Sequence, residues 1–94
     1  MPTSLRLIFS EEAARKLGKM QTKHATGIVS GLEAIAFNPF ASHPNVERLK
    51  GHKDWWRLRK GDWRILYFVD RQAQELKVEA VEHRSNAHRR LLLT

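Results

Sequence analysis

The stretch that decides the fold is D-W-W-R-L-R-K-G-D-W-R-I-L-Y-F, residues 54–68. Two runs of strand-forming residues flank Gly61-Asp62, a two-residue connection with glycine first, which is favoured in tight β-hairpins. With a loop of this length, Arg59 on the first strand lies opposite Arg64 on the second. The sequence therefore predicts a β-hairpin with one defined register.

Side chains alternate along each strand, so this hairpin has two different faces. One face is apolar and is expected to face the core; its residues are Trp56, Leu58, Trp63, Ile65 and Tyr67. The other is cationic near the turn and apolar beyond it; its residues are Trp55, Arg57, Arg59, Arg64, Leu66 and Phe68. Like charges placed side by side weaken a sheet, so we expect the second face to hold an anion. A three-residue loop would instead turn Arg64 away from Arg57 and Arg59.

The N-terminal half of the chain predicts one strand and two helices. Residues 5–9 alternate between two faces, as the residues of a strand do. Ser10 can then serve as the N-cap of a short helix, and Gly18 can end that helix in the left-handed conformation. A second helix is predicted over residues 22–37, where apolar residues follow three-four spacing until Asn38-Pro39 stops it.

The C-terminal half predicts a run of strands after a loop that extends to about residue 46. The predicted strands cover residues 55–59, 63–69 and 76–82, and a short helix is predicted over residues 85–92. Helices gathered on one face of a sheet make an α+β architecture. A chain of 94 residues has room for one core, so we expect residues 1–94 to form a single domain.

The composition predicts a basic protein that binds a polyanion. Seventeen Lys and Arg against ten Asp and Glu give a formal net charge of +7, and such an excess is typical of proteins that bind nucleic acid, an acidic protein or an anionic membrane. The chain has no cysteine, which excludes disulfides and cysteine chemistry. Because it shows neither a secretory signal nor an apolar run long enough to span a bilayer, we expect a cytoplasmic protein with no membrane partner.

Three blocks of sequence carry a family resemblance: L-K-G at residues 49–51, R-L-R followed by G-D-W-R-I-L-Y within residues 57–67, and H-R-S-N-A-H at residues 83–88. With these blocks the chain resembles the RelE/ParE toxin superfamily, and within it the RelE-type endoribonucleases that cleave messenger RNA. The resemblance implies a RelE-like fold with an N-terminal strand, a two-helix hairpin, antiparallel strands in a small curved sheet and a short C-terminal helix. It also implies a toxin of a type II toxin–antitoxin system that inhibits translation and needs no metal or other cofactor.

The resemblance further implies that a basic sheet face binds an RNA phosphate while the adjacent 2′-hydroxyl attacks it. The basic positions of the family fall on Arg57, Arg59, Arg64 and Arg84. Its frequent tyrosine, four residues beyond the last arginine, falls on His88, whose imidazole can give or take a proton near neutral pH. Where some members carry another arginine this chain has Glu82, which would weaken phosphate binding if it faced the same side.

These assignments define a candidate site and its partners. We expect catalysis by His88, Arg64 and Arg84, phosphate binding by Arg57, Arg59, Lys53 and Lys50, and stacking of a base on Trp55. The expected partners are a cognate antitoxin, in a hetero-oligomer with the toxin, together with messenger RNA and the ribosome. Other interpretations stay open: the arginines could form a solvated face that docks on an acidic partner, His88 could be an exposed helix residue, and Trp55 could be buried under the C-terminal tail.

Two other functions are compatible with the same sequence. A ParE-like toxin would share the fold but would inhibit DNA gyrase without cutting RNA. A non-catalytic basic module would bind RNA and do nothing more. The combination of Arg57, Arg59, Arg64 and His88 favours the ribonuclease, because a gyrase inhibitor has no need of a catalytic set.

Overall fold

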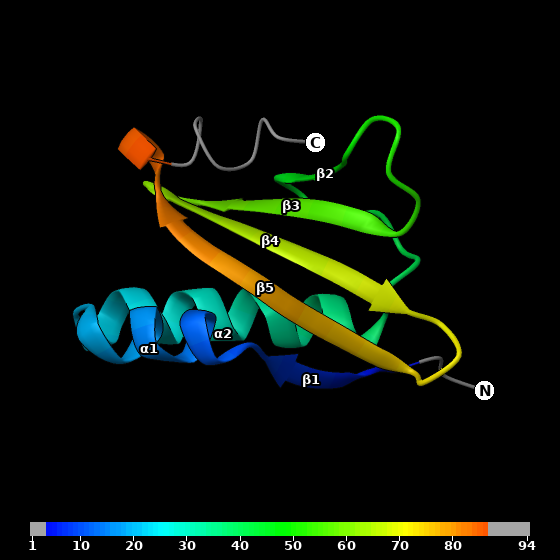
Figure 1. Ribbon diagram of the computed structural model, residues 1–94, viewed down its shortest axis with the longest axis horizontal. Helices are drawn as coiled ribbons and strands as arrows, with labels where there is room; N and C mark the ends of the chain where they lie inside the picture. The colour runs from blue at the N-terminus through cyan, green and yellow to red at the C-terminus, as the bar shows by residue number, and fades with distance from the viewer. Residues whose placement is uncertain (1–3, 87–94) are drawn as a thin grey trace.

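The computed structural model describes residues 4–86, which form a five-stranded sheet with two helices packed on one of its faces (Figure 1). In chain order the elements are β1 (Arg6–Phe9), α1 (Glu11–Lys19), α2 (Thr22–Phe37), β2 (Val46–Arg48), β3 (Trp55–Lys60), β4 (Trp63–Asp70) and β5 (Glu75–His83). The predicted α+β class is confirmed. Residues 84–86 are helical, and most of the helix predicted over residues 85–92 lies outside the described residues.

The strands lie side by side in the order β1-β5-β4-β3-β2. Strands β2 to β5 form three antiparallel pairs, whereas β1 runs parallel to β5 at one edge of the sheet. All four predicted strands are present, with bounds within about one residue of the prediction. Strand β2 was not predicted; it lies at the other edge and pairs only with β3 among the described strands.

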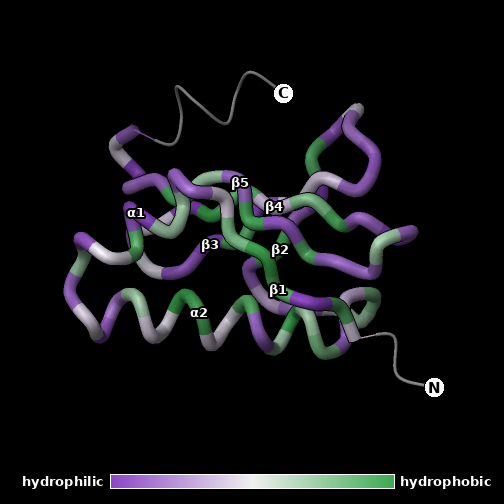
Figure 2. The backbone as a smooth tube through the Cα atoms, turned by 60° about the horizontal axis from the view of Figure 1, so that its bottom comes forward, coloured by the Kyte–Doolittle hydropathy of each residue, from purple (hydrophilic) through white to green (hydrophobic). Residues whose placement is uncertain are grey.

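The core lies between the two helices and the sheet. From α2 it takes Ile28, Leu32, Ile35 and Ala36, and from the sheet Leu58, Ile65, Tyr67, Val69, Leu76, Val78 and Val81. Hydrophobic and hydrophilic residues are interspersed along α2 and alternate over most of β5 (Figure 2), as expected of elements that are buried on one side. No helix within residues 4–86 is long and apolar enough to cross a membrane.

Ser10 links the start of α1 to β5. The predicted N-cap is confirmed, because the backbone N–H of Ala13 donates to Ser10 Oγ at 3.0 Å. Ser10 Oγ in turn donates to the carbonyl oxygen of Glu79 at 2.9 Å. Glu79 lies where the register of β5 against β4 shifts by one residue: Leu66 pairs with Ala80, whereas Tyr67 pairs with Val78. The cap of α1 therefore also satisfies a carbonyl at an irregular point of the sheet.

The predicted end of α1 at Gly18 is wrong. The helix continues to Lys19, and Met20 follows it in an extended conformation. The backbone N–H of Met20 bonds to the carbonyl oxygen of Leu17, so one of the last carbonyls is satisfied without a left-handed residue. Gly18 is consequently an ordinary helical position.

Gly61 offers a direct test of the hairpin turn, since it adopts a left-handed φ of 59°. We expect Gly61→Ala to lower the free energy of unfolding by about 1–2 kcal/mol, because a Cβ is unfavourable in that conformation. Gly18→Ala is the matched control: a Cβ there meets nothing within 4 Å and should raise stability by about 0.5–1 kcal/mol. Urea denaturation followed by circular dichroism measures both. Equal effects of the two substitutions would contradict a glycine-dependent turn.

Candidate functional site

The register of the β3–β4 hairpin is the predicted one. Arg59 pairs with Arg64 and Arg57 pairs with Leu66 across the two strands. The two-residue turn between them is closed by Gly61 with its positive φ. Arg57, Arg59 and Arg64 therefore project from the same face of the sheet, and we call this side of the sheet the arginine face.

Neither α1 nor α2 covers the arginine face, because both lie on the other side of the sheet (Figure 1). Leu58 and Ile65, which alternate with the arginines along the two strands, belong to the core that packs against the helices. Since alternate side chains point to opposite sides of a sheet, the arginines point away from α1 and α2. The face is thus accessible to a ligand as far as the described residues determine it.

Arg84 joins this group from the end of β5. The strand ends beside the hairpin turn, where Trp63 pairs with His83, and the backbone N–H of Arg84 donates to the carbonyl oxygen of Asp62 at 2.6 Å. An ion pair adds to this contact, with 3.6 Å between Arg84 Nε and Asp62 Oδ1. The turn residue Asp62 therefore fixes where the fourth arginine lies.

The four arginines are close enough to influence one another. Burial lowers the pKa of the Arg64 guanidinium, and repulsion from Arg59, Arg84 and Arg57 lowers it further, while Asp62 acts in the opposite direction. Arginine nevertheless keeps its charge in proteins. Arg64 is thus a partly buried cation among other cations, and a bound anion would relieve this unfavourable arrangement.

Glu47 of β2 is a neighbour of the arginine face that the sequence alone did not predict. It lies directly opposite Arg57, and the two side chains form an ion pair and hydrogen bond. The bond to Arg57, together with its charge, lowers the pKa of the Glu47 carboxyl. Arg57 keeps only 29% of its side chain exposed, so a ligand must compete with Glu47 for it.

Glu82 also lies on the arginine face. It pairs with Arg64 across β4 and β5, and only 9% of its surface is exposed. This is the orientation in which, by the sequence analysis, a glutamate at this position weakens phosphate binding. The face therefore carries two carboxylates, Glu47 and Glu82, among its arginines.

Lys50 and Lys53 do not gather with the arginines at the turn. Both are exposed and lie in the connection between β2 and β3, at the opposite end of β3 from Gly61. The six residues of β3 span about 17 Å at the usual rise of an extended strand. The two lysines can therefore reach only a ligand that extends along the whole strand.

Trp55 lies on the arginine face, as predicted, but already has an aromatic neighbour. Its ring centroid is 5.2 Å from that of Phe68, with the two rings tilted by 45°. The side chain is half-buried. Stacking of a base on Trp55 stays a prediction, and such a base would reach only the part of the indole that Phe68 leaves exposed.

The expected proton-transfer residue, His88, lies outside the described residues. His83 belongs to the opposite side of the sheet, where its ring lies edge-on to Trp63. Tyr67 is buried in the core, and burial raises the pKa of its hydroxyl. Within residues 4–86 no three His, Cys, Asp or Glu side chains gather to hold a metal ion. The described part of the arginine face thus offers charge stabilisation and no obvious proton donor.

The sequence of residues 7–88 matches the model of a family described as "ParE toxin of type II toxin-antitoxin system, parDE". This match spans nearly all of the described residues. It includes the hairpin and all five strands, except for the first residue of β1. No curated protein matches the chain.

Solved structures with the same fold include toxins of related names. The RelE–RelB complex of Pyrococcus horikoshii matches with a TM-score of 0.75 and 21% identity, over 89% of this chain and 99% of that chain. The isolated RelE toxin of E. coli matches with a TM-score of 0.74 and 20% identity, over 94% and 99%. A YoeB/ParE toxin from Agrobacterium tumefaciens matches with a TM-score of 0.70 and 20% identity, over 84% of this chain and 98% of that chain. At these identities the likeness shows a shared fold.

The pairing of Glu47 with Arg57 generates a prediction about anion binding. Glu47→Gln should release Arg57 for a ligand and raise the affinity for a polyanion such as heparin by about fivefold in about 0.1 M salt, the contribution of one added phosphate-like contact. Glu33→Gln is the matched control, because Glu33 is exposed on α2 and its replacement changes the net charge equally. Fluorescence titration measures both affinities. The same gain in both variants would mean that only net charge matters.

Proposed function

We propose that this chain, which belongs to the ParE toxin family of type II toxin–antitoxin systems, is an endoribonuclease toxin of the RelE type that cleaves messenger RNA on its arginine face. The observation that supports this proposal above all others is the gathering of Arg57, Arg59, Arg64 and Arg84 around one turn. A stack of like charges destabilises a sheet, and it is most easily understood as a site for an anion.

The proposed reaction needs no cofactor. The 2′-oxygen of one nucleotide forms a bond to the adjacent phosphorus, the bond from phosphorus to the 5′-oxygen breaks, and the products carry a 2′,3′-cyclic phosphate and a 5′-hydroxyl. One proton leaves the 2′-hydroxyl and one reaches the departing 5′-oxygen. Negative charge develops on the phosphate oxygens in the transition state, and arginine donors placed beside it stabilise that charge.

Arg64 and Arg84 have the central role in this scheme, and Arg57 and Arg59 hold the neighbouring phosphate oxygens. The planar guanidinium matches two phosphate oxygens at once and stays charged. His88 would transfer a proton, a contribution of about 10²–10⁴ in rate for a well-placed group. Lys50, Lys53 and Trp55 would contact the RNA further along β3.

We further propose that an antitoxin and the ribosome are its partners. The family is one of toxin–antitoxin systems, and the similar protein of Pyrococcus horikoshii was solved as a RelE–RelB complex. An acidic antitoxin segment would be attracted to the arginine face and would block RNA there. Messenger RNA positioned in the ribosome would present a single strand to the same face.

A second function, inhibition of DNA gyrase, is favoured by one observation: the family model that matches the chain is that of ParE. Expression of the chain in growing bacteria separates the two functions. Broken messenger RNA with intact chromosomes supports the ribonuclease. Intact transcripts with DNA damage would overturn it in favour of the gyrase inhibitor.

Arg64 gives the sharpest test of the proposed chemistry. Arg64→Ala should lower messenger RNA cleavage in a translating extract by about 10²–10³, because a preorganised donor to the transition state is lost. Arg64→Lys should restore only part of the rate, since lysine lacks the planar fork. Arg48→Ala is the control: Arg48 lies on the other side of the sheet, over the ring of Trp56. Comparable losses in the Arg64 and Arg48 variants would contradict a specific role for Arg64.

His88 is tested by separating binding from cleavage. His88→Ala should lower the cleavage rate by about 10²–10⁴ and leave the affinity for a non-cleavable 2′-deoxy oligonucleotide nearly unchanged, because the phosphate contacts come from the arginines. Single-turnover kinetics measure the cleavage rate, and anisotropy titrations measure the affinity for the oligonucleotide. Unaltered cleavage would remove His88 from the reaction.

A further inference from the structure

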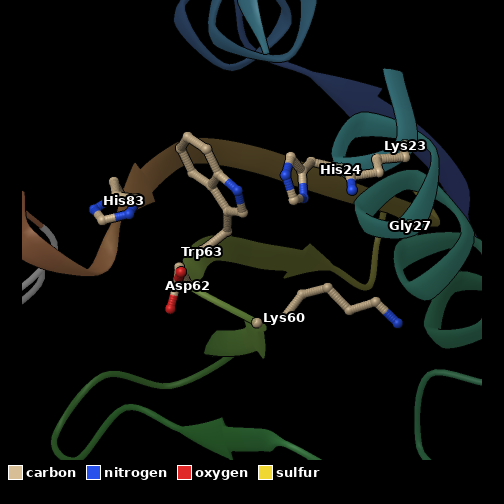
Figure 3. A pocket seen from close by; sticks show the side chains of 8 residues that line it. Lys23, His24, Gly27, Lys60, Asp62, Trp63 and His83 are labelled. Atoms are coloured by element: carbon tan, nitrogen blue, oxygen red, sulfur yellow. The ribbon is translucent and has the colours of Figure 1, made fainter. Parts of the chain in front are cut away.

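The hairpin turn has a second, hollowed side. A pocket of about 470 Å³ lies opposite the arginine face, between the tip of the hairpin and the first turns of α2 (Figure 3). Its lining includes Lys23, His24 and Gly27 from α2, Lys60 and Trp63 from the hairpin, and His83 from the end of β5. Three segments that are far apart in the sequence thus meet there.

The two lysines of this pocket are not neutralised by the described part of the chain. Within residues 4–86, Lys23 and Lys60 form no ion pair and no side-chain hydrogen bond. The acidic residue at the rim, Asp62, forms an ion pair with Arg84. The pocket consequently has positive charge available for an anionic group.

An aromatic side chain forms one wall beside these cations. Figure 3 shows the indole of Trp63 between the rings of His24 and His83, with Lys60 extending toward α2. Trp63 is half-buried, and its ring centroid is 5.4 Å from that of His83 in an edge-on contact. Cations next to an aromatic surface are typical of sites that bind single-stranded nucleic acid.

The pocket continues the arginine face around the tip of the hairpin. Because neighbouring side chains point to opposite sides of a strand, Arg59 and Arg64 face one side while Lys60 and Trp63 face the other. Arg64 Nη1 donates to the carbonyl oxygens of Gly61 at 2.9 Å and of Trp63 at 3.0 Å, so the turn is shared by both surfaces. A flexible RNA strand that is bound on the arginine face can pass around the tip of the hairpin and enter the pocket on the other side.

We propose that this pocket binds a nucleotide of single-stranded RNA next to the one held on the arginine face. Lys23 and Lys60 contact the phosphate, and the base packs against Trp63. This inference rests on the proposed function for the choice of RNA. An acidic protein segment would use the lysines but would leave the aromatic wall without a role.

The charge part of the proposal is tested with Lys23→Ala combined with Lys60→Ala. Binding of a short fluorescein-labelled single-stranded RNA, followed by anisotropy, should weaken by about 10- to 30-fold in about 0.1 M salt, and the slope of log affinity against log salt should fall by about 1.4, as expected for two lost contacts. Arg15→Ala combined with Lys16→Ala on α1 is the control with the same charge change outside the pocket. Equal losses in both double variants would overturn the proposal.

The shape part is tested without any change of charge. A Cβ at Gly27 would lie 3.5 Å from Lys60 Cε, an ordinary contact, so Gly27→Leu should fold and fill the pocket with its side chain. We expect at least a fivefold loss of RNA affinity with an unchanged salt slope. Thr26→Leu, at the exposed neighbouring position of α2, should bind as the parent does. Parent-like binding by a folded Gly27→Leu variant would overturn the pocket as a nucleotide site.

Two further measurements separate this proposal from the function on which it rests. If the parent protein leaves messenger RNA intact while the pocket variants still weaken RNA binding, the ribonuclease proposal fails and the pocket stands. If Arg64→Ala abolishes cleavage while the pocket variants bind RNA normally, the pocket fails alone. Weakened binding of polyglutamate with normal binding of RNA in the pocket variants would assign the pocket to an acidic protein and overturn the proposal.

Discussion

The pairing of Arg59 with Arg64 across the Gly61-Asp62 turn is the constraint on which the site depends. A slip of one residue would move every side chain of a strand to the other face, sending the arginines into the core and the core residues into solvent. The cost of that exchange is large, because Leu58 and Ile65 are almost completely buried. The hydrophobic side of the hairpin therefore holds two like charges together on the other side, against their repulsion. The cationic site is stable because it shares its strands with the core.

The strongest elements of the fold were predictable because their signals are local. The alternation along the hairpin, its glycine-first turn and the apolar stripe of α2 each specify a structure within a few residues. Strand β2, Val46–Arg48, carries no such signal: three residues are too few to show a period. Asn45 precedes the strand, and Asp54 ends the connection that follows it. Both residues have a positive φ, a conformation that is seldom predicted for a residue other than glycine. The opposite error was made at Gly18. This glycine was predicted to end the helix in a left-handed conformation, but its backbone is helical and does not require glycine.

The site was predictable in its arginines and only partly in their neighbours: Glu82 could be suspected from the sequence and lies opposite Arg64, whereas Glu47 could not. The alternation of side chains along two adjacent strands, together with the length of the turn, was enough to place Arg59 and Arg64 on one face. Glu47 was missed because its contact depends on the unpredicted β2, and Lys50 was grouped with the arginines because it is near them in sequence, although β3 carries it away. The pocket behind the turn could not be predicted at all. It forms only when α2 packs against the sheet and brings Lys23 to the hairpin, a tertiary arrangement without a local pattern.

The backbone is shared with the solved RelE and YoeB/ParE toxins, whereas the distribution of paired and unpaired charges depends on the side chains of this protein. The outer arginines have partners within the described part of the chain: Arg57 pairs with Glu47, and Arg84 pairs with Asp62. Arg59 and Arg64, at the centre, form no ion pair within residues 4–86. Glu82 lies directly opposite Arg64 in the strand register, yet Arg64 remains among three other arginines and is partly withdrawn from water as well. A face that served only solubility would gain nothing from crowding its cations in this way. The internal pairs hold the outer arginines in place, and Arg64 Nη1 bonds to the carbonyl oxygens of Gly61 and Trp63 in the turn. Under the proposed function, the remaining donors of Arg59 and Arg64 would contact the phosphate.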